Sequence, residues 1–421
     1  MLGKFRQTSA ARISLVAATL SIAGTLLAAA SAHADELKLP AKAAPPLYRK
    51  APPLAEPSRF WFGAEFLLWS TKRASLPPLA TVGDPADPFP GALGQPGTRV
   101  LFGGGPDGSS RTLPGFRLRG GYAVTNDWAV EAGGFWLQNR STQFAAQSGA
   151  NGLPVIGRPV VNALTGTEGT YVDSFPGFLA GGIAIDSSSS FWGLEANAAK
   201  QLSGHGTTGS RIEVLIGTRY LRLHDRLLIQ DNLTPTAPGF LTFLGGPADP
   251  PTTMSDFDRF TASNDFYGAQ LGVRGSLTAD RWIFGGSGKL ALGITRQTVG
   301  IDGSTSLFTP GAPTLTAPGG VLAQVTNIGT YKSNQFAFVP DLEVNAGYEI
   351  FPNAVIRVGY NLTYWSNVVR AGEQIDRTVN PGIVPSDTTF GTPGGPARPA
   401  FTFNRTDYWA QGLNVGFDYR F

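Results

Sequence analysis

The dipeptide His224–Asp225, in the segment LHDR, is the part of the sequence closest to a catalytic pair. A histidine oriented by a carboxylate can act as a general base. Adjacent residues of a strand point to opposite faces, however, so a strand through this segment would separate the two side chains. His205 lies in a predicted short turn. We therefore predict no catalytic residues and no enzyme.

Motifs for cofactors and metals are missing from the sequence. The chain has no cysteine, which excludes a thiol nucleophile, a redox pair and a cysteine-based zinc site. The glycine-rich segment FGGGP, residues 102–106, does not have the strand–helix context of a phosphate-binding loop. No acidic run has the spacing of a calcium-binding loop. We therefore predict no cofactor and no metal site.

Charged residues inside apolar segments are the remaining candidates, and Glu65 is the clearest of them. It interrupts the segment FWFGAEFLLW, residues 60–69. If this segment is a strand, its even positions form an apolar face and Glu65 lies on the other face. A carboxylate facing lipid would be costly, whereas one facing a polar interior is ordinary. We predict that Glu65 points into the lumen of a barrel and pairs with an arginine of a neighbouring strand, the candidates being Arg117, Arg119 and Arg420.

Period-two alternation dominates the chain from Phe60 onward and predicts the strands that would position these residues. The final segment, WAQGLNVGFDYRF, has apolar residues at alternate positions up to Phe421, with Gln411 as the one misfit. The same alternation predicts strands near residues 60–70, 113–123, 127–140, 191–202, 209–223, 264–278, 281–299, 334–350, 353–367 and 407–421.

The connections between these strands alternate between short and long. The short ones are VTND, GHGTTG, LTADR and FPN. The long ones, near 71–112, 141–190, 224–263, 300–333 and 368–406, are rich in Gly, Pro, Thr and Ser. Tight periplasmic turns that alternate with long outside loops are typical of an outer-membrane barrel. The predicted fold is therefore all-β, an antiparallel up-and-down transmembrane barrel of about ten strands, with eight to twelve compatible.

The N-terminus predicts export. Lys4, Arg6 and Arg12 precede a small apolar stretch, and SAHA at 31–34 has the Ala-x-Ala cleavage pattern. A retained transmembrane anchor is the alternative. We predict a signal peptide at 1–34 that is cleaved near Ala34, a Pro-rich periplasmic leader at 35–59, a barrel at 60–421, and the bacterial outer membrane as location. Without residues 1–34 the chain has 30 basic and 30 acidic residues, since three of its 33 basic ones are removed, and we expect no nucleic-acid partner.

The same alternation places many charged residues beside Glu65 in the lumen. One interpretation is a charged constriction that selects solutes. The other, which we favour because a small barrel has little room beyond its own side chains, is a salt-bridged core. The predicted lumen-lining residues are Glu65, Arg117, Arg119, Glu131, Glu195, Arg211, Glu213, Arg219, Arg274, Lys289, Glu343, Arg357, Asp418 and Arg420.

The eight tryptophans all lie in or at the ends of predicted strands. Several are expected to form the aromatic girdles that flank the lipid-facing band of a barrel. Stacking of one or two against a sugar is the alternative.

The first segment also resembles the N-terminal signature of the putative beta-barrel porin family 7. The resemblance rests on Glu-x-Leu-Leu-Trp ending at Trp69, then Leu-Pro-Pro-Leu at 76–79, Gly-x-Pro-Gly-Thr ending at Thr98, and Leu-Phe-Gly-Gly at 101–104. The segments GFRLRGGY, WAVEAGGFWL, IGTRYLRLHDRLLI and GFDYRF resemble later blocks of the family. Ser70 departs from the pattern, because members often have a second aromatic residue there.

This resemblance implies an outer-membrane barrel but no substrate and no catalytic residue. We expect a narrow porin-like channel for small solutes or a structural surface barrel. A surface binding or adhesion module that works through long extracellular loops is the alternative, and a rim hydrolase built on His224 and Asp225 is a weaker one. The expected partners are outer-membrane lipid, small solutes, and the barrel insertion machinery, which would recognise the C-terminal strand ending in Phe421.

Overall fold

The computed structural model describes residues 59–108, 112–203 and 209–421. The predicted signal peptide, the predicted leader except Arg59, and His205 lie outside the described residues. Within those residues, no helix is both long and apolar enough to cross a membrane. What is described consists of strands, loops and two short 3-10 helices.

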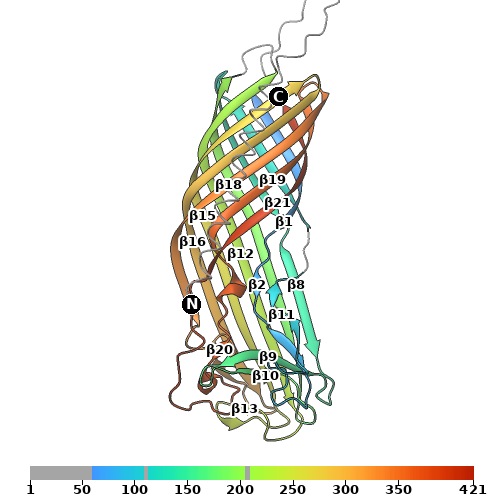
Figure 1. Cartoon of the computed structure of the whole chain (residues 1–421), viewed down its shortest axis with the longest axis vertical. Helices are drawn as coiled ribbons and strands as arrows, with labels where there is room; N and C mark the ends of the chain where they lie inside the picture. Colours follow the sequence, from blue (N-terminus) through green and yellow to red (C-terminus); the bar gives the residue numbers. More distant parts are fainter. Residues whose placement is uncertain (1–58, 109–111, 204–208) are drawn as a thin grey trace, which may run out of the picture.

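Ten antiparallel strands of the described chain form a closed ring (Figure 1). In chain order they are β1 (Phe60–Thr71), β6 (Thr112–Ala123), β7 (Trp128–Leu137), β11 (Leu179–Ser203), β12 (Ser210–Pro235), β15 (Thr253–Ala279), β16 (Trp282–Phe308), β18 (Gly329–Phe351), β19 (Ala354–Val369) and β21 (Arg405–Arg420). β1 pairs with β21 on one side and with β6 on the other, so the first and last strands close the barrel. The sequence-based prediction of a barrel of about ten strands is confirmed.

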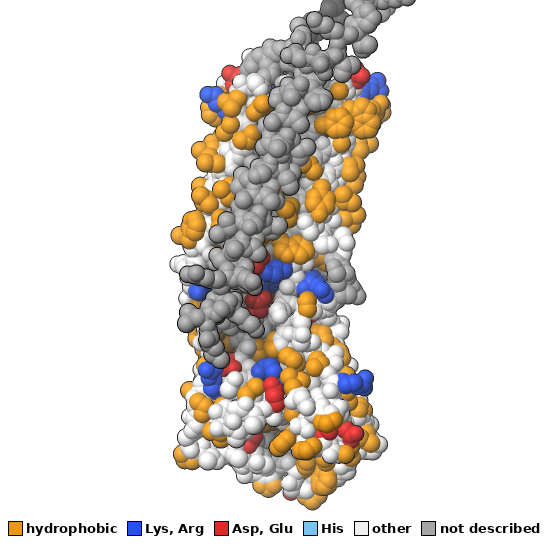
Figure 2. Space-filling model, in the orientation of Figure 1, with side chains coloured by type: hydrophobic (Ala, Val, Ile, Leu, Met, Phe, Trp, Pro, Cys, Tyr) orange, Lys and Arg blue, Asp and Glu red, His pale blue; other side chains and the backbone are white. Residues whose placement is uncertain are grey.

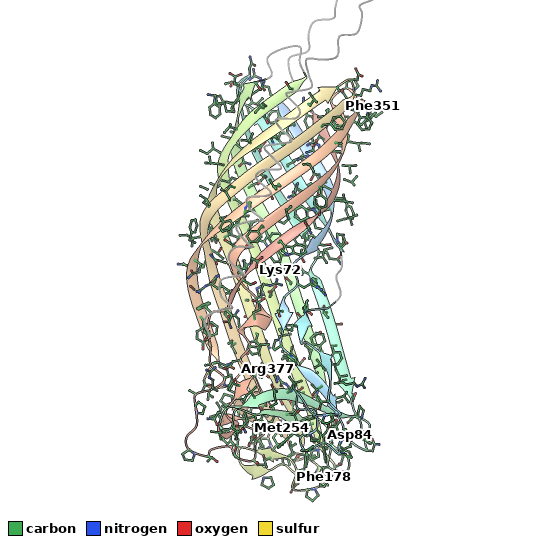
Figure 3. All side chains as sticks on the ribbon, viewed as in Figure 1. Lys72, Asp84, Phe178, Met254, Phe351 and Arg377 are labelled. Atoms are coloured by element: carbon green, nitrogen blue, oxygen red, sulfur yellow. The ribbon has the colours of Figure 1, made fainter. Side chains whose placement is uncertain are left out.

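The short turns bring neighbouring strands together at one end of the barrel. β15 and β16 are joined through Asp280, and β18 and β19 through Asn353. These residues have left-handed φ angles of 53° and 74°, which aspartate and asparagine tolerate better than most residues. Figure 3 shows Phe351 at this end and Phe178 at the opposite tip.

Alternating exposure along each strand separates a lipid face from a lumenal face. In β1, Phe66 is 52% exposed whereas its neighbour Leu67 is fully buried inside the barrel. Leu271 and Phe336 are likewise exposed on the outside. Figure 2 shows that hydrophobic side chains cover the half of the molecule with the short turns, while charged ones appear at its rim and over the other half. Exposed apolar residues in this band are what a membrane-embedded barrel requires.

The strands continue well beyond the predicted ends on the extracellular side. The prediction of loops at 141–190 and 224–263 is wrong over much of both segments, because β11 begins at Leu179 and β12 runs to Pro235. In this extension, outward positions such as Ser188 are polar, while inward ones such as Ile185 are fully buried. The serine-rich composition of this segment is therefore typical of a loop, although the residues at its inward positions are buried in the barrel extension. The short strand β8 (Arg140–Gln147) also belongs to this extension and pairs with β11.

A small mixed sheet covers the extracellular end. It is assembled from three separate loops: β3 (Ala80–Gly83) and β4 (Arg99–Phe102), then β9 (Val155–Asn162) and β10 (Glu168–Val172), and finally β20 (Thr378–Val379), which runs parallel to β9. We call this assembly the extracellular sheet. The remaining short elements are β2 (Ser75–Leu76), β5 (Gly105–Pro106), β13 (Thr242–Phe243), β14 (Gly246–Pro247), β17 (Leu315–Pro318), η1 (Ala371–Gln374) and η2 (Pro381–Ile383).

Candidate functional site

A polar cavity of about 610 Å³ occupies the half of the lumen near the short turns. Every residue that the sequence predicted to face the lumen lines this cavity, except Glu65. Glu65 lies behind the lining, 4% exposed, against the arginines that form it. Cations and carboxylates alternate around the wall and pair with one another in three groups.

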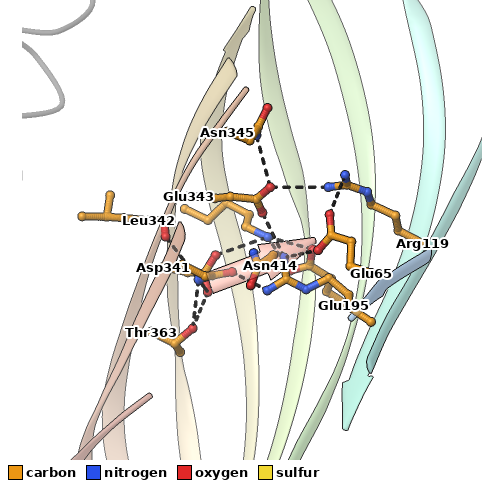
Figure 4. A network of polar contacts seen from close by, with 12 residues as sticks. Glu65, Arg119, Glu195, Asp341, Leu342, Glu343, Asn345, Thr363 and Asn414 are labelled. Carbon is orange, nitrogen blue, oxygen red and sulfur yellow. Dashed lines mark hydrogen bonds and ion pairs between the residues drawn. The ribbon is translucent and has the colours of Figure 1, made fainter. Parts of the chain in front are cut away.

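Glu65 bridges two arginines of the neighbouring strand β6. Its Oε1 lies 2.7 Å from Nη2 of Arg119, and its Oε2 accepts a hydrogen bond from Nη1 of Arg117 at 3.2 Å. Figure 4 shows this carboxylate pointing towards the Arg119 guanidinium. The third candidate partner, Arg420, lies opposite Trp61 at the mouth of the cavity. The structure thus pairs Glu65 with two of the three proposed arginines.

The same two arginines also contact carboxylates of strands that are not adjacent to β6. Glu343 of β18 lies 3.0 Å from Nη1 of Arg117 and 3.5 Å from Nη1 of Arg119. Asp418 of β21 lies 3.4 Å from Arg119 and also pairs with Arg357. Strands that are not neighbours in the ring are therefore tied together through the lumen.

A second group of ion pairs is centred on Glu195 of β11. Its carboxylate contacts Arg219 at 2.6 Å and Lys289 at 2.7 Å. Asp341 lies 3.4 Å from Arg219 and 3.5 Å from Lys289, which completes a four-membered ring of charges. Paired in this way, the charges offset part of the cost of leaving water.

A third group lies near the mouth of the cavity. Arg274 contacts Glu131 at 2.8 Å and Glu213 at 2.7 Å. Arg211, which is more exposed, pairs with Glu213. Within the described residues, no set of three or more histidine or acidic side chains is arranged to hold a metal ion.

Glycine creates the space that Glu65 occupies. Gly416 is the cross-strand partner of Glu65 in β21, and a Cβ at this position would lie 2.5 Å from Cγ of Glu65. Similarly, a Cβ at Gly63 would lie 2.3 Å from Oδ1 of Asp418. Both distances are too short for real atoms, so the glycines permit long charged side chains to lie flat against the barrel wall.

Beyond the cavity, towards the extracellular side, an aromatic layer crosses the lumen. It consists of Trp69, Phe191, Phe266, Trp365 and Tyr408, each at most 3% exposed. The ring centroids of Phe191 and Tyr408 are 4.9 Å apart, and those of Phe191 and Trp365 are 6.4 Å apart. Because β11 and β19 are on opposite sides of the ten-stranded ring, this last contact spans the barrel. The layer therefore closes the lumen in this structure.

The chain that follows β19 folds inward above the aromatic layer. Asn264 anchors it by donating to the carbonyl of Val369 at 2.8 Å and accepting from its N–H at 2.7 Å. Arg370 then forms a buried ion pair with Asp225 of β12. Most of the segment 368–406 is a connection between strands, as predicted. Its first part, however, lies inside the barrel extension.

His224 and Asp225 lie on opposite faces of β12. Asp225 is buried inside against Arg370, whereas Nδ1 of His224 lies 2.8 Å from the Ser263 hydroxyl. The expected separation of adjacent side chains is therefore observed.

A buried cluster ties the extracellular sheet to the barrel wall. Arg158 of β9 lies 2.6 Å from Asp231 and 3.3 Å from Asp256, and it also pairs with Asp258. We call these four residues the Arg158 cluster. Asp258 additionally accepts hydrogen bonds from the backbone N–H groups of residues 321–323, including that of Ala323 at 2.8 Å. All four side chains are at most 3% exposed.

The model of one protein family, described as Putative beta barrel porin-7, matches residues 61–421. This match covers most of the chain and all of the barrel except Phe60. The chain belongs to this family. The family fits what the geometry shows, a closed β-barrel with an apolar outer band and a charged lumen. A search of curated protein sequences found no match to this chain.

Solved structures similar to this family member include three outer-membrane barrels. The outer membrane protease OmpT from Escherichia coli is 11% identical, with a TM-score of 0.39, and the match covers 87% of this chain and 98% of that chain. The attachment invasion locus protein Ail of Yersinia pestis is 6% identical, with a TM-score of 0.23 and coverages of 87% and 99%. The toluene transporter TodX of P. putida is 9% identical, with a TM-score of 0.19 and coverages of 87% and 91%. Similarity at this level concerns the barrel fold alone.

Replacing Glu65 by glutamine is expected to lower the stability of the barrel by about 1–3 kcal/mol, because two partly buried arginines lose one of the two carboxylates that they share. The measurement is the temperature at which the barrel loses its compact migration in a detergent gel. The exposed pair of Arg259 and Asp302, 3.3 Å apart outside the lumen, supplies the control Asp302→Asn. An exposed ion pair of this kind contributes well under about 1 kcal/mol. Equal shifts in both variants would contradict a structural role for Glu65.

Proposed function

We propose that this family member is a closed outer-membrane barrel that presents a folded extracellular structure and carries no steady ion current. The observation on which this proposal rests is the aromatic layer, in which Phe191 and Trp365 meet across the lumen. Ions would have to cross a layer of aromatic rings that are each at most 3% exposed, which is strongly unfavourable for a charge.

The polar cavity supports the same proposal. Its cations and carboxylates are engaged mainly with each other, as in the ring formed by Glu195, Arg219, Lys289 and Asp341. In a solute channel, charged groups must be available to replace the hydration of the passing solute. Here they act as cross-links that hold the strands in register.

Support for a role at the cell surface comes from the extracellular sheet. Three separate loops contribute strands to it, and the Arg158 cluster fixes it to β12 and β15. Ordering this much chain costs conformational entropy, and a barrel needs no such sheet to span a membrane. We propose that surface structure, or binding through this sheet, is the role of the protein. No catalytic step is part of this proposal.

A narrow porin-like channel for small solutes is the second candidate. It is favoured by the 610 Å³ cavity, which reaches from the mouth near Arg420 to the aromatic layer. For this function the layer and the inward-folded chain after β19 would have to move.

Single-barrel recordings in planar lipid bilayers distinguish the two candidates. We expect silence at moderate voltages, with incorporation verified by the heat-modifiable gel migration of barrel recovered from the same membranes. Stable current steps in several independent preparations would overturn the closed-barrel proposal and favour the channel.

A further inference from the structure

Four neighbouring strands mark one side of the membrane boundary with a row of apolar residues. On β12, β15, β16 and β18, the lipid-facing apolar positions end at Tyr220, Tyr267, Ile294 and Phe336. These four residues are successive cross-strand partners. Tyr267, Ile294 and Phe336 are each more than half exposed. Aromatic side chains at the end of an apolar run are typical of the interface between lipid and water.

Four basic residues lie within the first three outward-facing positions beyond this row. They are Arg222 and Arg226 on β12, Arg296 on β16 and Lys332 on β18, and we call them the cationic patch. Asp265 is the one carboxylate among the first three outward positions of these four strands. Four cations against one carboxylate leave a net charge of +3, with histidine counted as neutral.

Most of this charge is not neutralised by the protein itself. Arg222 lies 3.7 Å from Asp265, whose Oδ1 already accepts a hydrogen bond from the Tyr220 hydroxyl at 2.6 Å. In the part of the chain that the structure describes, Arg226, Arg296 and Lys332 form no ion pair within 4 Å, and all three are exposed. Lumenal cations such as Arg117, Arg219 and Lys289, by contrast, are held by carboxylates.

Several outward-facing charges elsewhere in the described extension occur as pairs, and the neighbouring strand β11 adds one carboxylate, Asp186, in the position diagonal to Arg226. On the far side of the ring, Lys72 of β1 lies 2.6 Å from Asp407 of β21. Further out on β15 and β16, Arg259 lies 3.3 Å from Asp302. The excess of positive charge is therefore concentrated on one side of the barrel, within the first three outward positions beyond the apolar band.

We propose that the cationic patch binds the phosphate groups of anionic lipids in the outer leaflet. Lipid phosphates lie at the level where an apolar protein band gives way to a polar surface. Guanidinium groups bind phosphate oxygens in a bidentate manner, and lysine adds a compact charge. Cross-strand spacing places Arg296 and Lys332 on adjacent strands in a diagonal arrangement about 7–8 Å apart, close enough to contact one phosphate-bearing headgroup together.

This inference is independent of whether the lumen conducts. It requires the membrane orientation in which the long loops are outside, together with a phosphate-bearing outer leaflet. A lipid bound here would form an annulus on one side of the barrel beside the extracellular extension.

The test is lipid retention by the full-length barrel purified in a neutral detergent. Diphosphoryl lipid A is titrated into the sample, and bound copies are counted by native mass spectrometry. The variant carries Arg226→Gln, Arg296→Gln and Lys332→Gln, and the control carries Lys200→Gln and Arg281→Gln at the opposite rim. Each basic residue contributes to the affinity for anionic lipid. We therefore expect the variant to bind diphosphoryl lipid A about 100-fold more weakly than the wild type and the control to bind it equally well.

Three further arms complete the test. Dephosphorylated lipid A should bind to the wild type as weakly as diphosphoryl lipid A binds to the variant. Inorganic phosphate at millimolar concentration should compete only slightly, because the acyl chains hold the lipid at the barrel wall. An Arg226→Lys, Arg296→Lys variant, which keeps the charge, should retain binding within about tenfold. Retention of diphosphoryl lipid A by the glutamine variant, or equal loss in the control, would overturn the proposal.

Discussion

Replacing Arg158 by methionine is expected to destabilise the extracellular end of the barrel by about 3–5 kcal/mol, because it leaves buried carboxylates without a counter-charge. Arg158 contacts Asp231 at 2.6 Å, Asp256 at 3.3 Å, and Asp258. Methionine fills a similar volume, so the loss is electrostatic rather than a cavity. Cleavage within the extracellular sheet by a protease, at conditions where the membrane-embedded strands stay protected, measures the effect.

The effect should depend on pH in a definite direction. Asp256 lies well beyond the aromatic end of its strand and Asp173 lies in the loop after β10, so both carboxyls are outside the lipid band. Burial raises the pKa of Asp256 well above its ordinary value, and the nearby charge of Asp231 raises it further. Burial and Asp231 likewise raise the pKa of Asp173. Arg158 lowers the pKa of both carboxyls, so its removal raises both values more.

A carboxyl with a raised pKa in the folded state favours folding while it is protonated. The stability that such a carboxyl contributes is fully present at pH values below its ordinary pKa, which is near 3.8. This stability is lost as the pH rises through the raised pKa of the folded state. The Arg158→Met variant should therefore approach wild-type resistance at pH 5 and fall furthest behind at pH 7.5. Papain, which is active over this range, is a suitable protease.

Arg398→Met serves as the matched control. Arg398 belongs to the same extracellular region and pairs with Asp376 at 2.7 Å, but its side chain is 47% exposed. An exposed pair contributes under about 1 kcal/mol. If Arg158→Met were no more sensitive than Arg398→Met at pH 7.5, the Arg158 cluster would not be what holds the sheet in place.

Replacing Trp365 by alanine is expected to destabilise the barrel by about 3–5 kcal/mol, the usual range for removing a large buried aromatic side chain. Trp365 is fully buried, contacts Phe191 and Phe266 across the lumen, and donates from Nε1 to the Thr295 hydroxyl at 2.9 Å. The substitution leaves a void in the aromatic layer and an unpaired hydroxyl. A large fall in the temperature of the heat-modifiable transition measures the loss.

Trp136→Ala is the control, because Trp136 is 40% exposed on the outside of β7, in the lipid-facing band. Lipid chains can occupy the space that its ring leaves, so we expect a much smaller shift. Trp365→Phe should recover part of the loss by refilling the layer. Similar shifts for Trp365→Ala and Trp136→Ala would mean that the aromatic layer is not a packed element of the core.

The fold class and the faces of the membrane-spanning strands could both be predicted from the amino-acid sequence. Alternation is a local property: side chains in a strand point to opposite sides, so the parity of Phe66 and Glu65 was sufficient to assign one to lipid and one to the lumen. The short turns could also be predicted from the sequence. Residues such as Asn353 favour the backbone conformation of a tight turn because of their residue type.

The length of the strands could not be read in this way. Beyond the membrane, the outward positions of β11 and β12 become polar, and serine-rich segments such as 186–190 resemble loops. These segments are strands because Ile183 and Ile185 pack inside the barrel extension against residues of distant loops. The stabilising contacts are non-local, and no window of the sequence contains them.

Which lumenal residues meet depends on how the strands are arranged in the closed ring. The parity of a strand says that Trp69, Phe191 and Trp365 face inward, but the stagger of the closed ring determines that they meet at one level and close the lumen. The same holds for Glu65, for which three arginines were possible partners and register selected Arg117 and Arg119. The role of Arg158 could not be predicted from the sequence. A single arginine in a loop forms a buried cross-link only when the fold places three aspartates around it.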